Sequence, residues 1–337
     1  MNSNWQDFLG ASGAHLNHAM VSDFGDIDAE LATARDATII APLPHLGLLE
    51  CTGDDAKSFL HNQVTSDINH LESASAQYSS WCTAKGRVLA SFLLYRTDSG
   101  YLALLSADLL AVIQKRLQMF VMRSKVKITD LSSGHEAIGL SGPQAEAALH
   151  SAGLPVPAKA LETAAFTGGR VIRLDDSRYI LIVISAAAAE LWTKLAANAR
   201  PAGTPVWHWL DIRAGIPLIT EATKEAFIPQ MTNFDKIGGV SFHKGCYPGQ
   251  EVVARTQYLG KVKRHLYRIH TTNVIAGGDA IFAPVNPEHP CGMVANAAPA
   301  PGGGYDALAV IQETFVATND LQLGVPGGQR MVRVTLI

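Results

Sequence analysis

TGDDAKSFLH, residues 52–61, is followed further along the chain by SGPQAEAALH, residues 141–150, with glycine, alanine, leucine and histidine at the same places. A short apolar run precedes each segment, and the glycine that follows it interrupts that run. The apolar residues after each glycine are spaced as on one face of a helix. The two segments therefore predict the same strand, turn and helix twice, in two related α+β domains. Two unrelated uses of a common local structure remain the alternative.

The segments after each copy add strands and one long helix to each predicted domain. Arg87–Arg96 and Tyr101–Leu105 are expected as a strand pair, followed by an amphipathic helix at Leu109–Val121. After the second copy, Tyr179–Ile184 is expected as a buried strand and Ala186–Ala199 as a helix. Both halves therefore follow the same α+β pattern.

The character of the chain changes at about Val262, where short β-like runs are separated by glycine and proline. This pattern predicts a small all-β barrel at the C-terminal end. Its expected strands are Arg264–His270, Ala280–Phe282, Gly292–Ala297, Ala307–Ala317 and Arg330–Leu336. The predicted division is a first α+β domain at 1–50 with 136–235, a second at 51–135, a junction loop at 236–261 and the barrel at 262–337.

The composition excludes several classes of protein. Of the 337 residues 47% are hydrophobic and 17% are charged, which is typical of a packed globular chain with two or three domains. Neither a leader peptide nor an apolar stretch of about 18 residues is visible, so we expect a cytoplasmic protein without a membrane partner. The formal net charge of −3 argues against strong direct binding of nucleic acid. We also expect a monomer.

The cysteines indicate neither a metal site nor a disulfide framework. They lie far apart and form no C-x-x-C pair, the spacing that zinc and iron–sulphur sites use. We therefore expect no intrinsic metal. The four residues are Cys51, Cys82, Cys246 and Cys291.

One cysteine lies in an unusual loop, HKGCYPGQEVVAR at residues 243–255. Glycines allow close approach of the backbone, and an amide and a carboxylate follow at Gln250 and Glu251. Lys244 and His243 give Cys246 an electropositive setting that favours a reactive thiol. The alternative is a small buried cysteine packed at a turn.

The order of residues in this region is more specific than its amino-acid composition. FIPQMTNFDKIGGVSFHKGCYPGQEVVARTQYLGKVKR, residues 227–264, resembles the signature of the YgfZ family, folate-binding proteins related to the aminomethyltransferase (T-protein) of the glycine cleavage system. GDDAKSFLHNQVTSD at 53–67, TAKGRVLASF at 83–92 and DIRAGIP at 211–217 fit the same resemblance. The family motif K-G-C-Y-x-G-Q-E is present here as Lys244, Gly245, Cys246, Tyr247, Pro248, Gly249, Gln250 and Glu251.

The resemblance implies a fold, a cofactor and a role. The fold is a three-domain ring, two α+β domains and a C-terminal β-barrel, around a channel that holds tetrahydrofolate or another reduced folate. The role is accessory, in the assembly or repair of iron–sulphur clusters in client enzymes, including enzymes that modify tRNA. Cys246 is then the candidate working thiol, and Lys244, Gly245, Tyr247, Gly249, Gln250 and Glu251 shape its loop.

This chain departs from the T-protein at one place that the T-protein uses for aminomethyl transfer. There a glycine pair is followed closely by two aspartates, whereas here Lys85 and Gly86 are followed by RVLAS at 87–91. An apolar side chain cannot hydrogen-bond a folate amine or handle its proton. We therefore expect no glycine-cleavage activity. A folate-dependent aminomethyltransferase and a scaffold that has lost folate remain the alternatives.

Other residues are candidates for folate binding. Arg213 and Arg255 are expected to pair with the carboxylates of the folate tail, since guanidinium binds carboxylate in a bidentate manner. Structural ion pairs are the alternative for both. Trp209 is a candidate for stacking on the pterin ring, with core packing as the alternative.

Overall fold

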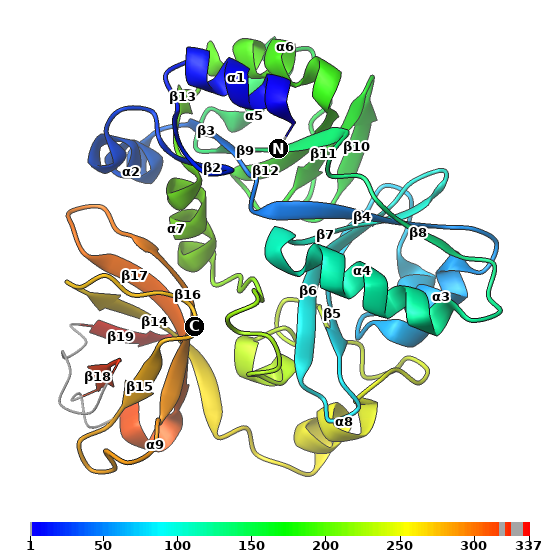
Figure 1. Ribbon diagram of the computed structural model, residues 1–337, viewed down its shortest axis with the longest axis vertical. Helices are drawn as coiled ribbons and strands as arrows, with labels where there is room; N and C mark the ends of the chain where they lie inside the picture. The colour runs from blue at the N-terminus through cyan, green and yellow to red at the C-terminus, as the bar shows by residue number, and fades with distance from the viewer. Residues whose placement is uncertain (1, 317–320, 325–332) are drawn as a thin grey trace. The chain divides into compact units, whose positions relative to one another are not determined.

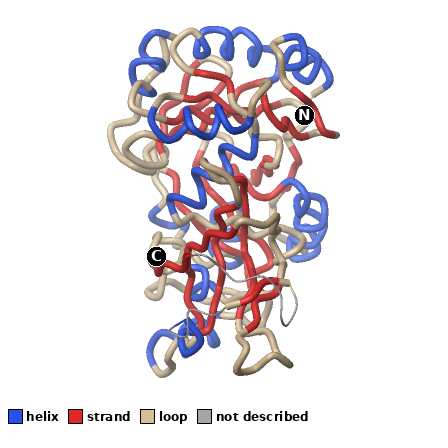
Figure 2. Tube along the Cα trace, turned by 90° about the vertical axis from the view of Figure 1, so that its left-hand side faces the viewer, coloured by secondary structure: helices blue, strands red, loops and turns tan. Residues whose placement is uncertain are grey.

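The computed structural model describes residues 2–316, 321–324 and 333–337. The chain forms two compact units, and Figure 1 labels the helices and strands of both. The first unit consists of Met1–Lys57, His70–Gln77 and Leu93–Trp207, and the second of Ser58–Asn69, Tyr78–Phe92 and His208–Ile337. Helices and strands both occur along the described chain (Figure 2), so the fold is mixed α/β. No helix within the described ranges is long and apolar enough to cross a membrane.

A six-stranded sheet in the first unit has the order β10-β11-β12-β9-β3-β13. One face of it packs against three helices around a core that includes Trp5, Leu149 and Trp192. These helices are α1 (Ser3–Ala11), α5 (Ala145–Ser151) and α6 (Ser185–Ala196). The strands are β3 (Ile39–Pro42), β9 (His135–Ser141), β10 (Thr163–Phe166), β11 (Gly169–Arg173), β12 (Arg178–Ile184) and β13 (Arg200–Pro201). The hairpin β1 (His15–Asn17) and β2 (Met20–Asp23) and the helix α2 (Ile27–Asp36) lie between α1 and β3 in the chain.

A second sheet has the order β5-β6-β7-β4-β8, and its strands β5 and β6 contain residues of both units. The helix α4 packs on β4, β7 and β8 through Leu109, Leu110, Ile113 and Leu117. The elements are β4 (Leu46–Thr52), α3 (Ala56–Gln63), the short helix η1 (Ile68–His70), β5 (Ala76–Cys82), β6 (Val88–Arg96), β7 (Gly100–Ser106), α4 (Ala107–Val121) and β8 (Lys127–Asp130).

The duplicated strand, turn and helix are confirmed. β4 is followed by Gly53 and α3, and β9 is followed by Gly142 and α5. Both glycines have positive φ, +114° and +129°, and a Cβ at either would overlap a backbone carbonyl, so both positions require glycine. In both copies three strands and a helix follow in the same order, and the third of these strands pairs antiparallel with the first strand of its copy. The proposed domain boundaries stay a prediction.

The C-terminal part is β-rich, as predicted. Its strands form a six-stranded sheet in the order β18-β15-β16-β17-β14-β19, with a core that includes Tyr267, Ile281 and Ile311. The predicted strand 307–317 is wrong in its second half, because β17 ends at Gln312 and Glu313–Val316 forms the helix α9. Residues 317 and 330–332 of the predicted strands lie outside the described residues. The strands are β14 (Arg264–Thr271), β15 (Ala280–Phe282), β16 (Gly292–Pro299), β17 (Tyr305–Gln312), β18 (Gln322–Leu323) and β19 (Arg333–Leu336).

Three helices flank the signature loop in the chain, two before it and one after it. They are α7 (Thr204–Ala214), the short helix η2 (Pro229–Thr232) and α8 (Gln250–Tyr258). The loop with Cys246 ends where α8 begins, and Gly249 is the N-cap residue of that helix.

Candidate functional site

The signature loop presents one accessible thiol. Cys246 is exposed, whereas Cys51, Cys82 and Cys291 are buried, and all four are free cysteines. Burial raises the pKa of Cys51 and of Cys82 to about 12 and also raises that of Cys291. Since the thiolate is the reactive form, the three buried cysteines are inert at neutral pH. Chemistry at a cysteine of this chain therefore points to Cys246.

Lys244 anchors the loop from inside. Its ammonium is buried and donates hydrogen bonds to three carbonyl oxygens, those of His61, of Val64 (2.6 Å) and of Ser66 (2.9 Å). His61 lies in the last turn of α3, and the other two carbonyls follow that helix. Burial lowers the pKa of Lys244 to about 8, against the opposing effect of Asp67. The lysine therefore acts as a cap for the C-terminal end of α3.

Tyr247 and Gln250 complete the inner side of the loop. The Lys244 ammonium lies 5.1 Å from the centre of the Tyr247 ring, a cation–π distance, and that ring is buried. Burial raises the pKa of the Tyr247 hydroxyl. The side-chain amide of Gln250 points back to the carbonyl oxygens of Lys244 and Gly245, at 3.4 and 3.5 Å. The motif residues thus hold one another while Cys246 and Gly245 stay exposed.

Two glycines let distant segments meet beside the loop. A Cβ at Gly249 would lie 2.5 Å from the carbonyl oxygen of Thr83 and 2.7 Å from Cα of Gly86, and Gly249 has a φ of +82°. A Cβ at Gly86, whose φ is +70°, would lie 3.0 Å from Cβ of Val252. Only glycine permits both the backbone conformation and this approach. The TAKGR turn therefore packs directly against the first turn of α8.

Hydrogen bonds attach a third segment to the same place. Thr65 Oγ1 donates to the carbonyl oxygen of Gly239 (2.6 Å), and the Ser241 amide donates to the carbonyl oxygen of Thr65 (2.9 Å). Thr65 Oγ1 also lies 3.0 Å from the Ser80 hydroxyl. The segments 53–67, 83–92 and 227–264, which sequence similarity groups together, are thus joined in one site.

Sequence reasoning missed two residues of this site, His61 and Asp67. Nδ1 of His61 lies 3.3 Å from Oδ1 of Asp67. Nε2 of the same ring lies 3.6 Å from where a Cβ at Gly245 would be, next to Cys246. The sequence shows His61 as a matched position of the duplicated segment, and His61 and Asp67 both lie in the stretch 53–67 that fits the same resemblance as the loop, but nothing in that stretch indicates that it meets the loop.

Two of the predicted folate-binding residues, Trp209 and Arg213, lie on α7. Trp209 is buried and its indole N–H donates to Oδ2 of Asp306 (2.9 Å), whose Oδ1 lies 2.9 Å from Nδ1 of His270. The Arg213 guanidinium is exposed and lies 5.8 Å from the Trp209 ring. Within the described residues, neither Trp209 nor Arg213 shares a hydrogen bond or ring contact with the signature loop. The structure brings these two residues together but does not join them to Cys246.

The outer face of α8 carries the remaining predicted residues. Glu251 lies in its first turn and Arg255 in its last, and both side chains are exposed. Arg255 forms no ion pair with any residue that the structure describes. Tyr258 and Leu259 at the end of the helix are also exposed, 61% and 85%, and the Tyr258 ring meets that of Phe242 edge to face. This face is exposed to solvent.

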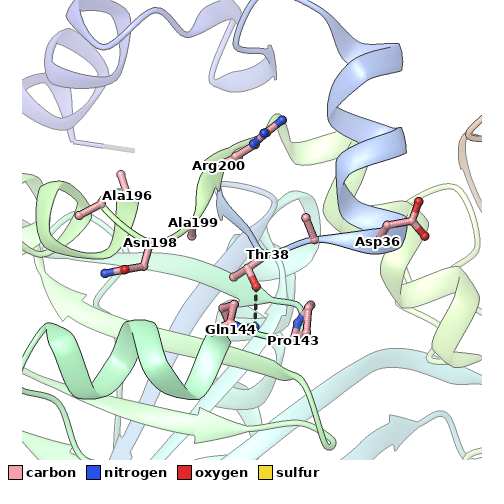
Figure 3. A pocket seen from close by; sticks show the side chains of 10 residues that line it. Asp36, Thr38, Pro143, Gln144, Ala196, Asn198, Ala199 and Arg200 are labelled. Atoms are coloured by element: carbon pink, nitrogen blue, oxygen red, sulfur yellow. Dashed lines mark hydrogen bonds between the residues drawn. The ribbon is translucent and has the colours of Figure 1, made fainter.

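A pocket of about 470 Å³ lies in the first unit (Figure 3). Thr38 and Gln144 meet in its wall, where the backbone N–H of Gln144 donates to Oγ1 of Thr38 (2.8 Å). The pocket borders the start of α5 and the segment 196–200. None of the predicted site residues, all of which the structure describes, lines it.

The second unit contains buried hydrogen-bond acceptors of the chemical type that binds the N–H donors of a folate. A pterin ring offers N–H donors along one edge, and a buried acceptor without a partner is a place for such a donor. Oε1 of Gln63, Oε1 of Gln230 and Oδ1 of Asp235 are buried and have no hydrogen-bond partner among the described residues. Gln230 uses its other side-chain atom to donate to the carbonyl oxygen of Val253 (2.7 Å). Arg213 offers the guanidinium that a tail carboxylate requires.

Comparison with known structures identifies the class of fold. The glycine cleavage system aminomethyltransferase T from Bartonella henselae superposes with a TM-score of 0.81, over 100% of this chain and 96% of that chain. The two are 17% identical in sequence, so this likeness concerns the fold. The model of the GCVT N-terminal domain family matches residues 10–171. The structure is therefore of the aminomethyltransferase type.

Sequence relatives narrow this class to one family. The tRNA-modifying protein YgfZ of Vibrio vulnificus (strain YJ016) is 35% identical over 230 residues, 68% of this chain and 69% of the relative. The tRNA-modifying protein YgfZ of Photobacterium profundum is 33% identical over 240 residues, 70% and 71% of the two chains. The chain belongs to the YgfZ family.

Proposed function

We propose that this protein is a folate-binding accessory protein that supports the assembly or repair of iron–sulphur clusters in client enzymes, including enzymes that modify tRNA. The observation that carries the proposal is the exposed thiol of Cys246 on a loop anchored by Lys244 and Gly249. A held loop keeps a reactive group in position for a partner. The names of the relatives, tRNA-modifying proteins, support a role connected with tRNA.

The accessory role is favoured over aminomethyl transfer by the strand that follows Gly86. Val88, Leu89 and Ala90 are buried in β6, at 0%, 1% and 0% exposure. An ionised carboxylate at such a position would need a partner to offset its desolvation. The strand thus offers no acid that would act on a folate amine, and the aminomethyltransferase alternative loses its proton-handling group.

In this proposal a reduced folate is the bound cofactor, as the family implies. The pterin edge would donate to Gln230 and Asp235, and Arg213, over the Trp209 ring, would hold a carboxylate of the tail. When bound, the folate supplies one-carbon or redox chemistry of its pterin. The three-domain ring with a closed C-terminal barrel, a cytoplasmic location and a monomeric state belong to the same proposal.

The working thiol is tested in a strain that lacks the wild-type protein. We expect Cys246→Ala to lose most of the activity of a cluster-dependent tRNA-modifying enzyme, measured as the modified nucleoside in bulk tRNA. His243→Ala is the control, because its side chain is exposed in the same loop. Full client activity with Cys246→Ala would rule out the thiol.

Folate binding is tested by calorimetric titration of the purified protein with tetrahydrofolate under reducing conditions. Saturable binding by the wild type and by Cys246→Ala is expected, since the Cys246 thiol is not one of the buried acceptors proposed to bind the pterin. Absence of binding by the wild type would remove folate from the proposal and leave a scaffold.

A further inference from the structure

His61 lies against the loop of Cys246, in the same compact unit. Its Nε2 lies 3.6 Å from the position of a Cβ at Gly245, the residue directly before Cys246. Its carbonyl oxygen accepts a hydrogen bond from Lys244, the residue before that. The backbone of His61 is thus bonded to Lys244, and its ring lies beside the next residue of the motif, Gly245. The imidazole side chain is 12% exposed, so it is largely buried but still reaches solvent.

The two nitrogens of His61 have different surroundings. Nδ1 faces the Asp67 carboxylate at 3.3 Å, and Nε2 faces the side-chain amide of Asn69 at 3.5 Å. A carboxylate favours the proton on Nδ1, and an amide N–H donates only to an unprotonated nitrogen. Both neighbours favour the tautomer that leaves Nε2 as an acceptor. The Asn69 contact is long, so it leaves room for a stronger donor.

We propose that His61, oriented by Asp67, is the base that takes the proton of the Cys246 thiol. The proposal rests on Cys246 as the working thiol and adds the group that activates it. In the step, the S–H bond of Cys246 breaks, its proton forms an N–H bond at Nε2 of His61, and the electron pair stays on Sγ. No oxidant or reductant is required. The product is a thiolate–imidazolium pair, a nucleophile for electrophilic sulphur or a ligand for a soft metal ion.

The charges around the pair suit this transfer. Asp67 faces the imidazolium that forms and balances its charge. The Lys244 ammonium adds positive charge near the loop, which favours a thiolate, and Asp67 also acts on this lysine. The described contacts bring Asp67 and Lys244 to His61, and the loop itself adds Cys246, the buried Tyr247 and the exposed His243.

The second copy of the duplicated segment provides a matched control. His150 occupies the position of His61 in that copy, but its side chain is exposed and its carbonyl oxygen accepts from the Gly153 amide (3.0 Å). No cysteine of the chain lies in the loop that follows α5. His150→Gln therefore makes the same chemical change without the proposed partner.

The test is the rate at which iodoacetamide alkylates Cys246 at neutral pH, followed by mass spectrometry of the intact protein. The three buried cysteines do not compete. We expect His61→Gln to slow alkylation about tenfold or more, Asp67→Asn to slow it less, and His150→Gln to leave it unchanged. An unchanged rate in His61→Gln would overturn the proposal.

A second variant separates a base from a structural role. In His61→Gly, added imidazole is expected to restore alkylation in a concentration-dependent manner, because a free imidazole can occupy the vacated space. Slow alkylation without rescue would assign His61 a purely structural role and also overturn the proposal. Client activity is read separately: inactive Cys246→Ala with unchanged alkylation in His61→Gln rejects only the base, and active Cys246→Ala rejects the proposed function.

Discussion

The two copies of the strand–glycine–helix segment have the same local structure but different helix ends. α5 is capped by its own following residues: the Gly153 amide donates to the carbonyl oxygen of His150 (3.0 Å) and the Leu154 amide to that of Leu149 (2.9 Å). Gly153 has the positive φ of +74° that this kind of cap uses. The end of α3 is capped instead by the ammonium of Lys244, from a distant part of the sequence.

This difference explains why only the first copy belongs to the site of Cys246. A helix that satisfies its last carbonyls locally needs no partner, so its end can remain at the surface. A helix whose carbonyls depend on a side chain from elsewhere ties that other segment to itself. In α3 the tied segment is the Cys246 loop, and the cap also brings His61 to it. The capping lysine is therefore the feature that distinguishes the two copies.

The largest effect is expected from removing that lysine. Lys244→Met leaves three carbonyl acceptors without their donor, and each buried unsatisfied acceptor costs about 1–3 kcal/mol. We expect the free energy of unfolding, measured by urea denaturation, to fall by about 4 kcal/mol. Lys194→Met on α6 is the control, since Lys194 pairs with Glu190 only at the exposed surface, where screening by water leaves such a pair little effect on stability.

Equal losses in Lys244→Met and Lys194→Met would mean that the cap of α3 does not depend on the lysine. The distinction between the two helix ends would then fail. Cys246 alkylation in Lys244→Met reports on the loop itself, which we expect to become mobile once its anchor is lost.

A smaller effect is expected from filling the glycine contact of the loop. Gly249→Ala places a methyl group 2.5 Å from the Thr83 carbonyl oxygen in a positive-φ conformation, so strain and overlap add to about 3 kcal/mol. Gly153→Ala, in the self-capped copy, has positive φ but nothing within 4 Å, so only the conformational cost of about 1 kcal/mol remains. Thermal unfolding of both variants measures the difference. A loss in Gly153→Ala as large as in Gly249→Ala would show that close approach adds nothing.

The smallest effect is a pH dependence that belongs to the α3 cap. Burial lowers the pKa of Lys244 from 10.5 to about 8, so between these values the unfolded chain binds a proton that the folded protein has released. The stability contributed by this residue therefore rises as the pH increases through that range. We expect the difference in unfolding free energy between wild type and Lys244→Met to grow by about 1 kcal/mol from about pH 7.5 to about pH 9.5. A difference independent of pH would contradict the lowered pKa.

Much of the secondary structure was predictable because it depends on local patterns. The amphipathic helix predicted at Leu109–Val121 is α4, Ala107–Val121, and the buried strand predicted at Tyr179–Ile184 is β12, Arg178–Ile184. The predicted strand 307–317 was too long, because its apolar residues continue past Gln312 into the short helix α9. A short apolar run has no periodicity that separates strand from helix.

The candidate site was predictable only in part. The resemblance of the motif pointed to Cys246, and the structure shows this to be the exposed cysteine of the four. The role of Lys244 as a helix cap was not visible, because its partners are backbone carbonyls and any residue carries one. Arg213 and Trp209 were named only as folate-binding candidates, which stays a prediction; the structure places the two together, with Trp209 bonded to Asp306.

By itself, the sequence determined the duplicated strand–glycine–helix, the β-rich C-terminal part and the loop that carries the cysteine, since spacing and backbone freedom are encoded within a few residues. The tertiary structure alone decided that His61, and not His150, meets that loop. Identical local segments gain different neighbours because capping and packing partners come from distant parts of the chain, and those contacts form only when the whole core is buried.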